Sequence, residues 1–588
     1  MRLKYSWDAA RRDLLAGMTV AAISLPQAMA YALIAGIDPR FGLYSAIVVT
    51  AVASIFGSSS HLINGPTNAI SLVVFSALAF LDPEARFDAY QATFLLGLMV
   101  GVIQILIAVF KLGDLTRYIS ESVVLGFMAG AGCLVALGQF GNLLGIRDRG
   151  TGHQQVVERF WLTLTEGGPV NRYALGIGLG TIFLVIFLRK LARRYRLPQI
   201  DMLVALVTAA AVAAFFGWTQ PASGGRTLLA VVGEVPASLP LPHIPEIRFW
   251  WVKQLSGSAL AISFLGLLEA LAIAKSIAHQ TRQTLDYNKQ CFAEGVANLT
   301  GSFFQCLPGS GSLTRSAINF QAGAVSRMSG VFAAATTAAA VLLFAPLARY
   351  IPKAALAGLL VVTAARLVDW NRLRYAMRTS RYDAGLVVLT AAAAVFISVE
   401  FSILIGVALS ILLFVPRAAR LRVSELVVTT KQVLRERLPS DPPCPELLLY
   451  NLEGELFFGT APELDRFFEE VKLRISKEGT RVVVLRFKRT RNPDMVCLEL
   501  LQHFLQEMGR ERVVVLLCGV RPDLAKGLAN LRFADWFPAD RIFPESVETP
   551  SATLKAVASA YELLEANGIG RGGPTAARAD AGALSHQV

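Results

Sequence analysis

The segment GSGSLTRSAIN, Gly309–Asn319, combines an arginine with several hydroxyl side chains inside a region of long apolar runs. An arginine that faces lipid at membrane depth costs at least about 3 kcal/mol. We therefore expect Arg315 to face a water-filled cavity and to bind an anion there. The hydroxyls of Ser310, Ser312 and Thr314 could donate hydrogen bonds to the same anion.

Other interpretations of Arg315 stay open at this point. Its side chain could snorkel toward the membrane surface, which is easiest near the end of a helix. It could also pair permanently with a carboxylate and only hold two helices together. The small residues around it could form a close helix-packing face.

A second ionisable residue, Glu269, lies in the apolar run SFLGLLEALAIA. Desolvation disfavours an ionised carboxylate, whereas a nearby cation such as Arg315 favours it. In either case a carboxylate inside the membrane is a candidate proton carrier. The alternative is a structural ion pair that never titrates.

The composition predicts the setting of these residues. Of 588 residues, 54% are hydrophobic and 17% are charged, and the mean hydropathy is +0.51, which together indicate a polytopic membrane protein. The net charge of +13 is spread over short clusters between apolar runs, so it does not indicate nucleic-acid binding.

The N-terminus does not resemble a removable signal peptide. The scattered cysteines and histidines indicate no disulfide framework, metal site or cofactor, and no group of residues indicates an enzyme.

Apolar windows, measured against a hydrocarbon core of about 30 Å, predict fourteen membrane spans. They lie at 14–35, 41–57, 65–80, 92–111, 118–140, 173–188, 200–217, 256–274, 288–304, 310–323, 328–347, 353–367, 383–398 and 400–416. Lys and Arg are concentrated in alternate loops, which predicts an even number of spans with both termini in the cytoplasm.

The third and tenth spans are short, and each begins with a segment unlikely to be helical, NGPTNAIS in one case and the residues after Cys306 in the other. Interrupted segments at matching positions of two halves indicate a transporter binding site. The N-terminus of a half-helix carries about half a positive charge, so two such ends would favour an anion. The hydroxyl of Thr67, in the first of these segments, could also donate a hydrogen bond to the anion. In the first span, Pro26 interrupts the helix, and Gln27 and Tyr31 would face the same cavity.

Beyond about residue 420 the pattern changes to segments rich in β-branched residues that alternate with helical patterns at 460–475, 496–510 and 549–565. This alternation predicts a small α/β domain. The predicted organisation is a cytoplasmic N-terminal segment (1–12), a transmembrane domain (13–420), a linker (421–443), the α/β domain (444–566) and a disordered tail (567–588).

The run GMTVAAISLPQAMAYALIAGIDPRFGLYSAIV, with HLINGPTNAIS, the Glu269 span and PGSGSLTRSAIN, resembles the SulP (sulfate permease) family of anion transporters. The residues beyond 420 resemble the STAS domain of that family. The resemblance implies fourteen spans in a seven-plus-seven inverted repeat, core and gate domains that move as an elevator, and a homodimer. The resemblance also implies an anion-binding site, formed by Gln27, Tyr31, Thr67, Ser312, Leu313, Thr314 and Arg315.

In the same family the coupling carboxylate corresponds to Glu269. The pairing of this glutamate with Arg315 resembles the proton-coupled sulfate and animal anion-exchanger branches. In the sodium-coupled bicarbonate branch, the carboxylate is an aspartate and the arginine position is not basic. Soluble STAS regulators carry a phosphorylatable serine after an aspartate, whereas Met495 follows Asp494 here, so we expect no phosphorylation switch.

We therefore expect a sulfate:proton symporter in the cell's inner (plasma) membrane. Its partners would be a small inorganic anion, protons, the lipid bilayer and a second copy of the chain. Transport of bicarbonate, chloride or a C4-dicarboxylate, or anion exchange, is the alternative within the same architecture. An anion channel or a membrane sensor is the alternative from another class.

Overall fold

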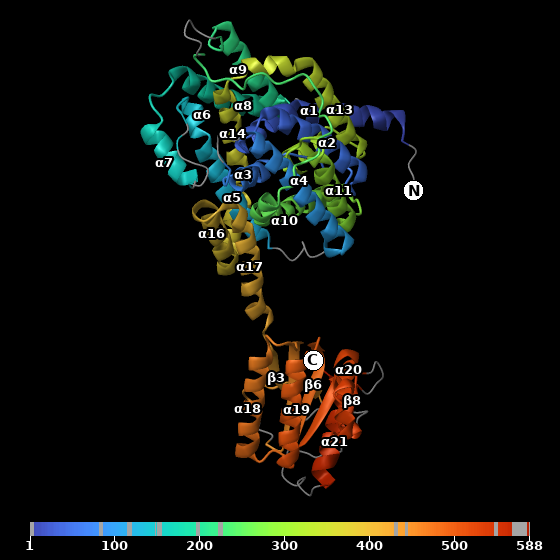
Figure 1. Ribbon diagram of the computed structural model, residues 1–588. Coiled ribbons are helices and arrows are strands. Elements are labelled where there is room, and N and C mark those ends of the chain that lie inside the picture. Colours follow the sequence, from blue (N-terminus) through green and yellow to red (C-terminus); the bar gives the residue numbers. More distant parts are fainter. Residues whose placement is uncertain are drawn as a thin grey trace. The chain divides into compact units, whose positions relative to one another are not determined.

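The structure is a computed structural model of the chain. It describes residues 5–81, 86–113, 120–147, 149, 154, 156–195, 200–220, 227–428, 433–441, 445–545, 551–566 and 585–586. The chain forms two compact units, Met1–Ser410 and Ile411–Val588. The first unit is helical, and the second combines a β-sheet with helices (Figure 1).

The first unit consists of helices with two very short strands between them. The helices are α1 (Trp7–Ile34), α2 (Pro39–Phe56), α3 (Asn68–Ala77), α4 (Arg86–Val109), α5 (Glu121–Gly138), α6 (Phe140–Leu144), α7 (Val156–Glu166), α8 (Arg172–Tyr195), α9 (Asp201–Phe215), α10 (Phe249–Thr281), α11 (Tyr287–Ser302), α12 (Leu313–Gln321), α13 (Met328–Phe344), the 3-10 helix η2 (Ala345–Tyr350), α14 (Lys353–Leu367), α15 (Trp370–Thr379), α16 (Arg381–Phe396) and α17 (Val399–Ala418), which ends in the second unit. The strands are β1 (Asn64–Gly65) and β2 (Ser310–Gly311).

Eight helical segments in the described part of the chain are long and apolar enough to cross a bilayer. They are Trp7–Ile34, Pro39–Phe56, Phe87–Val109, Glu121–Leu144, Arg172–Tyr195, Phe249–Ala278, Met328–Tyr350 and Lys353–Thr379. Each of the fourteen predicted segments overlaps a helix, but the predicted count of fourteen spans is not confirmed. Several of the other helices are too short to qualify, and α3 and α12 have only 10 and 9 residues.

Helix α1 is continuous from Trp7 to Ile34, although Pro26 was expected to interrupt it. A proline removes only one backbone hydrogen bond, and contacts with neighbouring helices can compensate for it within a membrane bundle. The start of α1 is anchored by the buried Asp13. Its carboxylate accepts hydrogen bonds from the backbone N–H groups of Val325 (2.7 Å) and Ser326 (3.0 Å).

The helices of the first unit pack in two groups. In the first helix group, α1–α4 and α10–α13, α4 packs against α11, and both α1 and α2 pack against α13. In the second helix group, α5–α9 and α14–α16, α5 packs against α16, and Figure 1 shows α8, α9 and α14 side by side. The two groups meet where α1 contacts α9 and α14 and where α3 contacts α5.

The second unit contains one mixed β-sheet. Its strands are β3 (Arg422–Val428), β4 (Val433–Glu436), β5 (Leu447–Glu455), β6 (Val482–Arg491), β7 (Val514–Val520), β8 (Ile542–Pro544) and β9 (Ser585–His586), in the order β8-β7-β6-β5-β3-β4-β9. Strands β5 to β8 are parallel, whereas β3 is antiparallel to both β4 and β5. Parallel strands are buried on both faces, which explains their continuous apolar runs.

Helices cover both faces of this sheet (Figure 1). The helices are α18 (Ala461–Glu478), α19 (Met495–Arg510), α20 (Pro522–Asn530) and α21 (Ala552–Ala566), with short 3-10 turns η3 (Phe533–Asp535) and η4 (Ala539–Arg541). Helices α18, α19 and α20 share one apolar cluster with the sheet, and α21 shares another.

The structure of the second unit bears on two predicted segments, the linker and the C-terminal tail. The predicted linker, 421–443, contains β3 and β4, which are strands of the same sheet. The valines of RVSELVV were the overlooked, weak signal for a strand. The predicted disordered tail lies outside the described residues, except for Ser585–His586, which pairs with β4.

Candidate anion-binding site

The two short strands bring the third and tenth predicted spans together. β1 and β2 are antiparallel, with Asn64 opposite Gly311 and Gly65 opposite Ser310. Helix α3 begins three residues after β1, and α12 begins two residues after β2. The first N–H groups of a helix have no partner inside the helix and carry its positive dipole end. We call the two paired strands and the first turns of α3 and α12 the crossing site.

Arg315 is buried at the crossing site and does not snorkel. Its side chain is 1% exposed. Within the described residues its guanidinium donates hydrogen bonds to the carbonyl oxygens of Asn64 (3.5 Å) and Pro66 and forms no salt bridge, although Glu269 is close enough to interact with it electrostatically. Its Nε has no hydrogen-bond partner among the residues that the structure describes. The guanidinium thus donates to backbone carbonyls while no direct salt bridge in the described residues neutralises its charge, an arrangement that favours a nearby anion.

Gly65 makes the position of this guanidinium possible. Its φ is +139°, a backbone conformation that side chains disfavour. A Cβ atom at this position would lie 2.6 Å from Nη1 of Arg315. The glycine of the NGPTNAIS motif therefore allows the arginine to approach the backbone of β1.

Glu269 on α10 faces the same site. Thr67 is the N-cap of α3; its hydroxyl accepts from the Ile70 N–H (3.4 Å) and donates to Oε2 of Glu269 (3.4 Å). Tyr31 of α1 is buried and interacts electrostatically with both Arg315 and Glu269. The structure thus gathers four of the predicted residues, from α1, α3, α10 and α12.

The remaining predicted residues lie in several environments. Ser312 is the buried N-cap of α12, Thr314 is half-buried, and Leu313 is 62% exposed. Gln27 is buried on α1, where its Nε2 contacts the sulfur of Met202 on α9 (3.5 Å) and its Oε1 has no partner within the described residues.

Ser310, which the sequence suggested as an anion donor, donates instead to the carbonyl oxygen of Gly266 on α10 (2.7 Å). Its hydroxyl therefore attaches β2 to α10. The Thr67 hydroxyl likewise donates to Glu269, so the hydroxyls that remain as candidate anion donors are those of Ser312 and Thr314, beside the guanidinium of Arg315.

Neutral polar side chains that the sequence analysis did not single out hold the broken backbone in place. The amide of Asn298 on α11 donates to the carbonyl of Gly309 (3.0 Å) and accepts from the Gly309 N–H (2.8 Å). Thr50 on α2 donates to the carbonyl of Asn64 (2.6 Å), and Ser316 accepts from the Ile63 N–H (2.9 Å). Each bond satisfies a backbone group that no helix satisfies at this depth.

A second buried carboxylate, Glu294 on α11, is 1% exposed and was not predicted from the sequence. It lies in the predicted span 288–304 among several polar residues, including Gln290 and Asn298, so it stands out less than Glu269; a charge inside an expected span was the signal that could have found it. The described residues contain no group of His, Cys, Asp and Glu side chains that could hold a metal ion.

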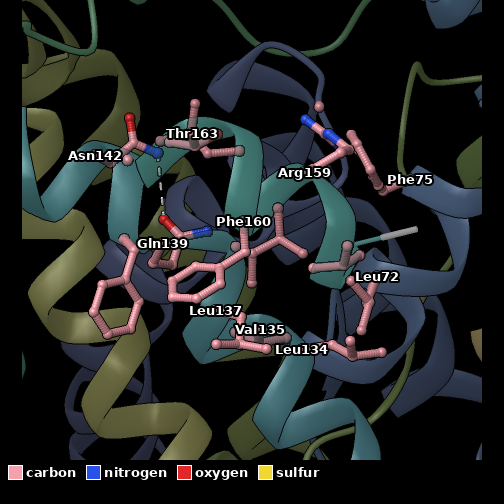
Figure 2. A pocket seen from close by; sticks show the side chains of 17 residues that line it. Leu72, Phe75, Leu134, Val135, Leu137, Gln139, Asn142, Arg159, Phe160 and Thr163 are labelled. Carbon is pink, nitrogen blue, oxygen red and sulfur yellow. Dashed lines mark hydrogen bonds between the residues drawn. The ribbon is translucent and has the colours of Figure 1, made fainter. Parts of the chain in front are cut away.

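A cavity of about 220 Å³ lies between the two helix groups and is separate from the crossing site. Figure 2 shows Leu72 and Phe75 of α3 on one side, Leu134 and Leu137 of α5 on another, and Arg159 of α7 beside Phe75. The Arg159 guanidinium lies 4.9 Å from the centroid of the Phe75 ring. None of the predicted site residues is among the described residues that line this cavity.

Comparison with known proteins gives a consistent result for both units. The sequence pattern of the sulfate permease family matches residues 11–390, and that of the STAS domain matches residues 440–549. The chain is 27% identical over 551 residues to sulfate transporter 4.1, chloroplastic, of Arabidopsis thaliana, covering 91% of this chain and 79% of the relative.

Two solved structures are similar in fold. The structure of the murine Solute Carrier 26 family member A9 anion transporter in the inward-facing state matches with a TM-score of 0.84 at 20% identity, covering 96% of this chain and 92% of the other. The transmembrane domain of the cyanobacterial bicarbonate transporter BicA matches with a TM-score of 0.60 at 24% identity, covering 69% of this chain and 98% of the other. The chain therefore belongs to the sulfate permease family, a family of membrane transporters, and carries a STAS domain after its transmembrane unit.

Proposed function

We propose that the chain is a secondary active transporter that carries sulfate together with protons. The observation that supports this most is the buried Arg315 guanidinium, which has no carboxylate partner in the described residues and lies at the crossing site. A tetrahedral oxyanion can accept hydrogen bonds from a guanidinium and from helix N–H groups at the same time. The proposed binding residues are Gln27, Tyr31, Thr67, Ser312, Leu313, Thr314 and Arg315.

We infer proton coupling from the electrical work that sulfate uptake requires. A dianion that enters a cell against an inside-negative potential of 100 mV needs about 4.6 kcal/mol, at about 2.3 kcal/mol per charge. Protons that enter with it remove this cost. Glu269, which accepts a hydrogen bond from Thr67 at the crossing site, is the proposed carrier of one proton.

The two helix groups suggest how the site reaches both sides of the membrane. The first helix group contains the crossing site, and it would move against the second as an elevator. In this proposal fourteen segments span the membrane in two inverted sets of seven, α3 and α12 being the interrupted ones. The protein would be a homodimer in the plasma membrane, with both termini in the cytoplasm.

Transport of bicarbonate, chloride or a C4-dicarboxylate, or anion exchange, is the second candidate, because the fold matches that of a bicarbonate transporter. The presence of both a glutamate at 269 and an arginine at 315 supports sulfate instead, since a resemblance to the sodium-coupled bicarbonate branch would place an aspartate and a nonbasic residue at these positions. An anion channel would follow the membrane potential alone, and a sensor would move no anion.

The first test replaces Arg315 by alanine. Loss of charged hydrogen bonds of about 1.5–3 kcal/mol should weaken sulfate binding roughly 10- to 100-fold. Arg315→Lys should recover part of the loss, because lysine keeps the charge without the planar fork. The measurement is uptake of radiolabelled sulfate into proteoliposomes with an acidic exterior, at several sulfate concentrations.

Arg327→Ala is the matched control for this experiment. Arg327 also donates to backbone carbonyls, those of Ile55 (3.1 Å) and Gly57 (2.6 Å), but it lies beyond α12 and outside the crossing site. Its removal should leave the sulfate affinity within about twofold. Equal sulfate affinities in wild type and Arg315→Ala would refute the proposed site.

The second test replaces Glu269 by glutamine, which cannot exchange a proton in the transport cycle. The variant should exchange internal for external sulfate and should concentrate sulfate less than wild type when the exterior is made acidic. Accumulation equal to that of wild type in Glu269→Gln would remove the role of this residue. Competition by bicarbonate, chloride and C4-dicarboxylates in the same assay identifies the preferred anion.

A further inference from the structure

Glu294 is a buried carboxylate that the mechanism above leaves unused. Its Oε1 accepts a hydrogen bond from Nε2 of Gln290, one turn earlier on α11 (3.1 Å). Its Oε2 has no hydrogen-bond partner within the described residues, and the side chain is 1% exposed. A buried carboxylate takes up a proton more readily when a second negative charge, such as a bound oxyanion, arrives nearby.

Polar groups connect Glu294 to the crossing site. The side chain of Asn64 lies next to the Glu294 carboxylate, and its Nδ2 has no hydrogen-bond partner within the described residues. The backbone carbonyl of the same Asn64 accepts from Nη1 of Arg315 (3.5 Å). One residue of β1 thus lies between the second carboxylate and the arginine.

Polar groups also lead from Glu294 in the other direction. Gln290, the donor to Glu294, accepts from the backbone N–H groups of Ser58 (2.9 Å) and Ser59 (3.2 Å) in the loop after α2. Ser58 is partly exposed. Glu294 therefore lies between this loop and the crossing site. A carboxylate at this position could exchange protons with both regions.

Few charged groups face Glu294 from the elements packed against α11. Helix α10 contributes Glu269, which interacts repulsively with Glu294. The residues of α2 and α4 that reach β1 and α11, Thr50 and Gln104, are uncharged. The cation on the far side of Asn64 is Arg315.

We propose that Glu294 is a second proton-carrying carboxylate of the transport cycle, so that each sulfate crosses the membrane with two protons, one on Glu269 and one on Glu294. This inference rests on the proposed sulfate:proton symport. Each step moves one proton onto a carboxylate oxygen when sulfate binds and returns it to water when sulfate leaves. No covalent bond other than O–H forms or breaks.

Two carriers keep the charge of the moving site constant. Without cargo, Arg315 and two ionised carboxylates carry a net charge of minus one. With sulfate and two protons bound, the arginine, the dianion and two neutral carboxyl groups again carry minus one. If Glu269 alone took a proton, loading would add one uncompensated negative charge to a buried site, which is unfavourable in a low-dielectric environment.

The test measures how far sulfate accumulates in proteoliposomes with the membrane potential clamped at zero and the exterior one pH unit more acidic. Each coupled proton then contributes a factor of ten to the equilibrium ratio of internal to external sulfate. Wild type should reach about 100-fold accumulation and Glu294→Gln about tenfold. Glu121→Gln, at the exposed start of α5, is the control and should match wild type.

A second measurement needs only folded protein. Sulfate added to purified transporter in weakly buffered solution should draw about two protons per bound sulfate from water in wild type and about one in Glu294→Gln, with Glu294→Asp restoring the second. A residue with only a structural role would reduce the amount of active protein without changing this ratio.

The outcomes separate this inference from the function on which it rests. If wild type does not accumulate sulfate under the acid gradient, the proposed symport fails. If wild type accumulates sulfate and Glu294→Gln reaches the same limit, or takes up the same number of protons per sulfate, Glu294 carries no proton and this inference alone is overturned.

Discussion

At the scale of single residues, the crossing site depends on one close approach. The guanidinium of Arg315 lies against the backbone of Gly65 and donates to the carbonyls of Asn64 and Pro66 on either side of it. Its position therefore depends on the absence of a side chain at Gly65. The arginine and the glycine should behave as one functional unit.

Gly65→Ala tests this coupling. The added Cβ would lie 2.6 Å from Nη1 of Arg315, so the guanidinium must move, and we expect sulfate affinity to fall at least about tenfold. Gly233→Ala is the matched control, because Gly233 also has a positive φ (+96°) but no described residue has an atom within 4 Å of the added Cβ. The measurement is equilibrium binding of sulfate to both purified variants. Equal affinity in both would contradict the coupling.

The sequence predicted some of these residues and missed others for a physical reason. Arg315 and Glu269 stand out because a charge in an apolar run is costly wherever it lies. Neutral side chains such as Asn298 and Thr50 are inexpensive in many positions, and their role depends on which backbone groups they meet. That information exists only once β1 and β2 are paired.

At the scale of elements, the interrupted segments could be predicted because proline and glycine disfavour helix at NGPT and PGSG. Their pairing could not be, since residues 64 and 310 are far apart in the chain. In the second unit, the α/β domain was predicted from segments rich in β-branched residues, which form β5, β6 and β7. Strands β3 and β4 were assigned to a linker, because short, partly exposed strands give a weak signal.

The turn that follows β4 contains an ion pair whose contribution to stability can be measured. Both oxygens of Asp441 accept hydrogen bonds from the guanidinium of Arg435 (2.6 and 2.7 Å). These bonds, together with one from the backbone N–H of Leu438, lower the pKa of Asp441 to about 2. A carboxyl group with a lowered pKa stabilises the folded state above its ordinary pKa, and this contribution disappears as the pH falls toward 2.

Asp441→Asn should therefore reduce the protection of β4 amides from hydrogen exchange at neutral pH. The difference between wild type and variant should narrow as the pH falls from about 4 to about 2. Exchange is measured on the full-length protein with correction for intrinsic rates. Asp465→Asn, an exposed change on α18, should have no effect, and a difference for Asp441→Asn that does not depend on pH would contradict this assignment.

In the molecule as a whole, elevator transport requires the two helix groups to move relative to each other. Leu33 of α1 and Leu137 of α5 line the cavity between them, in the region that Figure 2 shows. Cysteines at both positions, joined by a bifunctional thiol reagent, should stop sulfate transport while leaving sulfate binding intact.

The crosslinking experiment uses a background in which Cys133, an exposed cysteine, is replaced by serine. Each single-cysteine variant treated with the same reagent is the control and should continue to transport. Undiminished transport in the crosslinked double variant would show that transport does not require α1 and α5 to move relative to each other.

The position of a bound oxyanion would show whether Arg315 and the first turns of α3 and α12 form the anion site. Crystals grown with selenate, a sulfate analogue, should give an anomalous selenium peak about 4 Å from the Arg315 guanidinium carbon, beside the first N–H groups of α3 and α12. A selenium peak elsewhere, for example in the cavity of Figure 2, with none beside Arg315, would contradict the account.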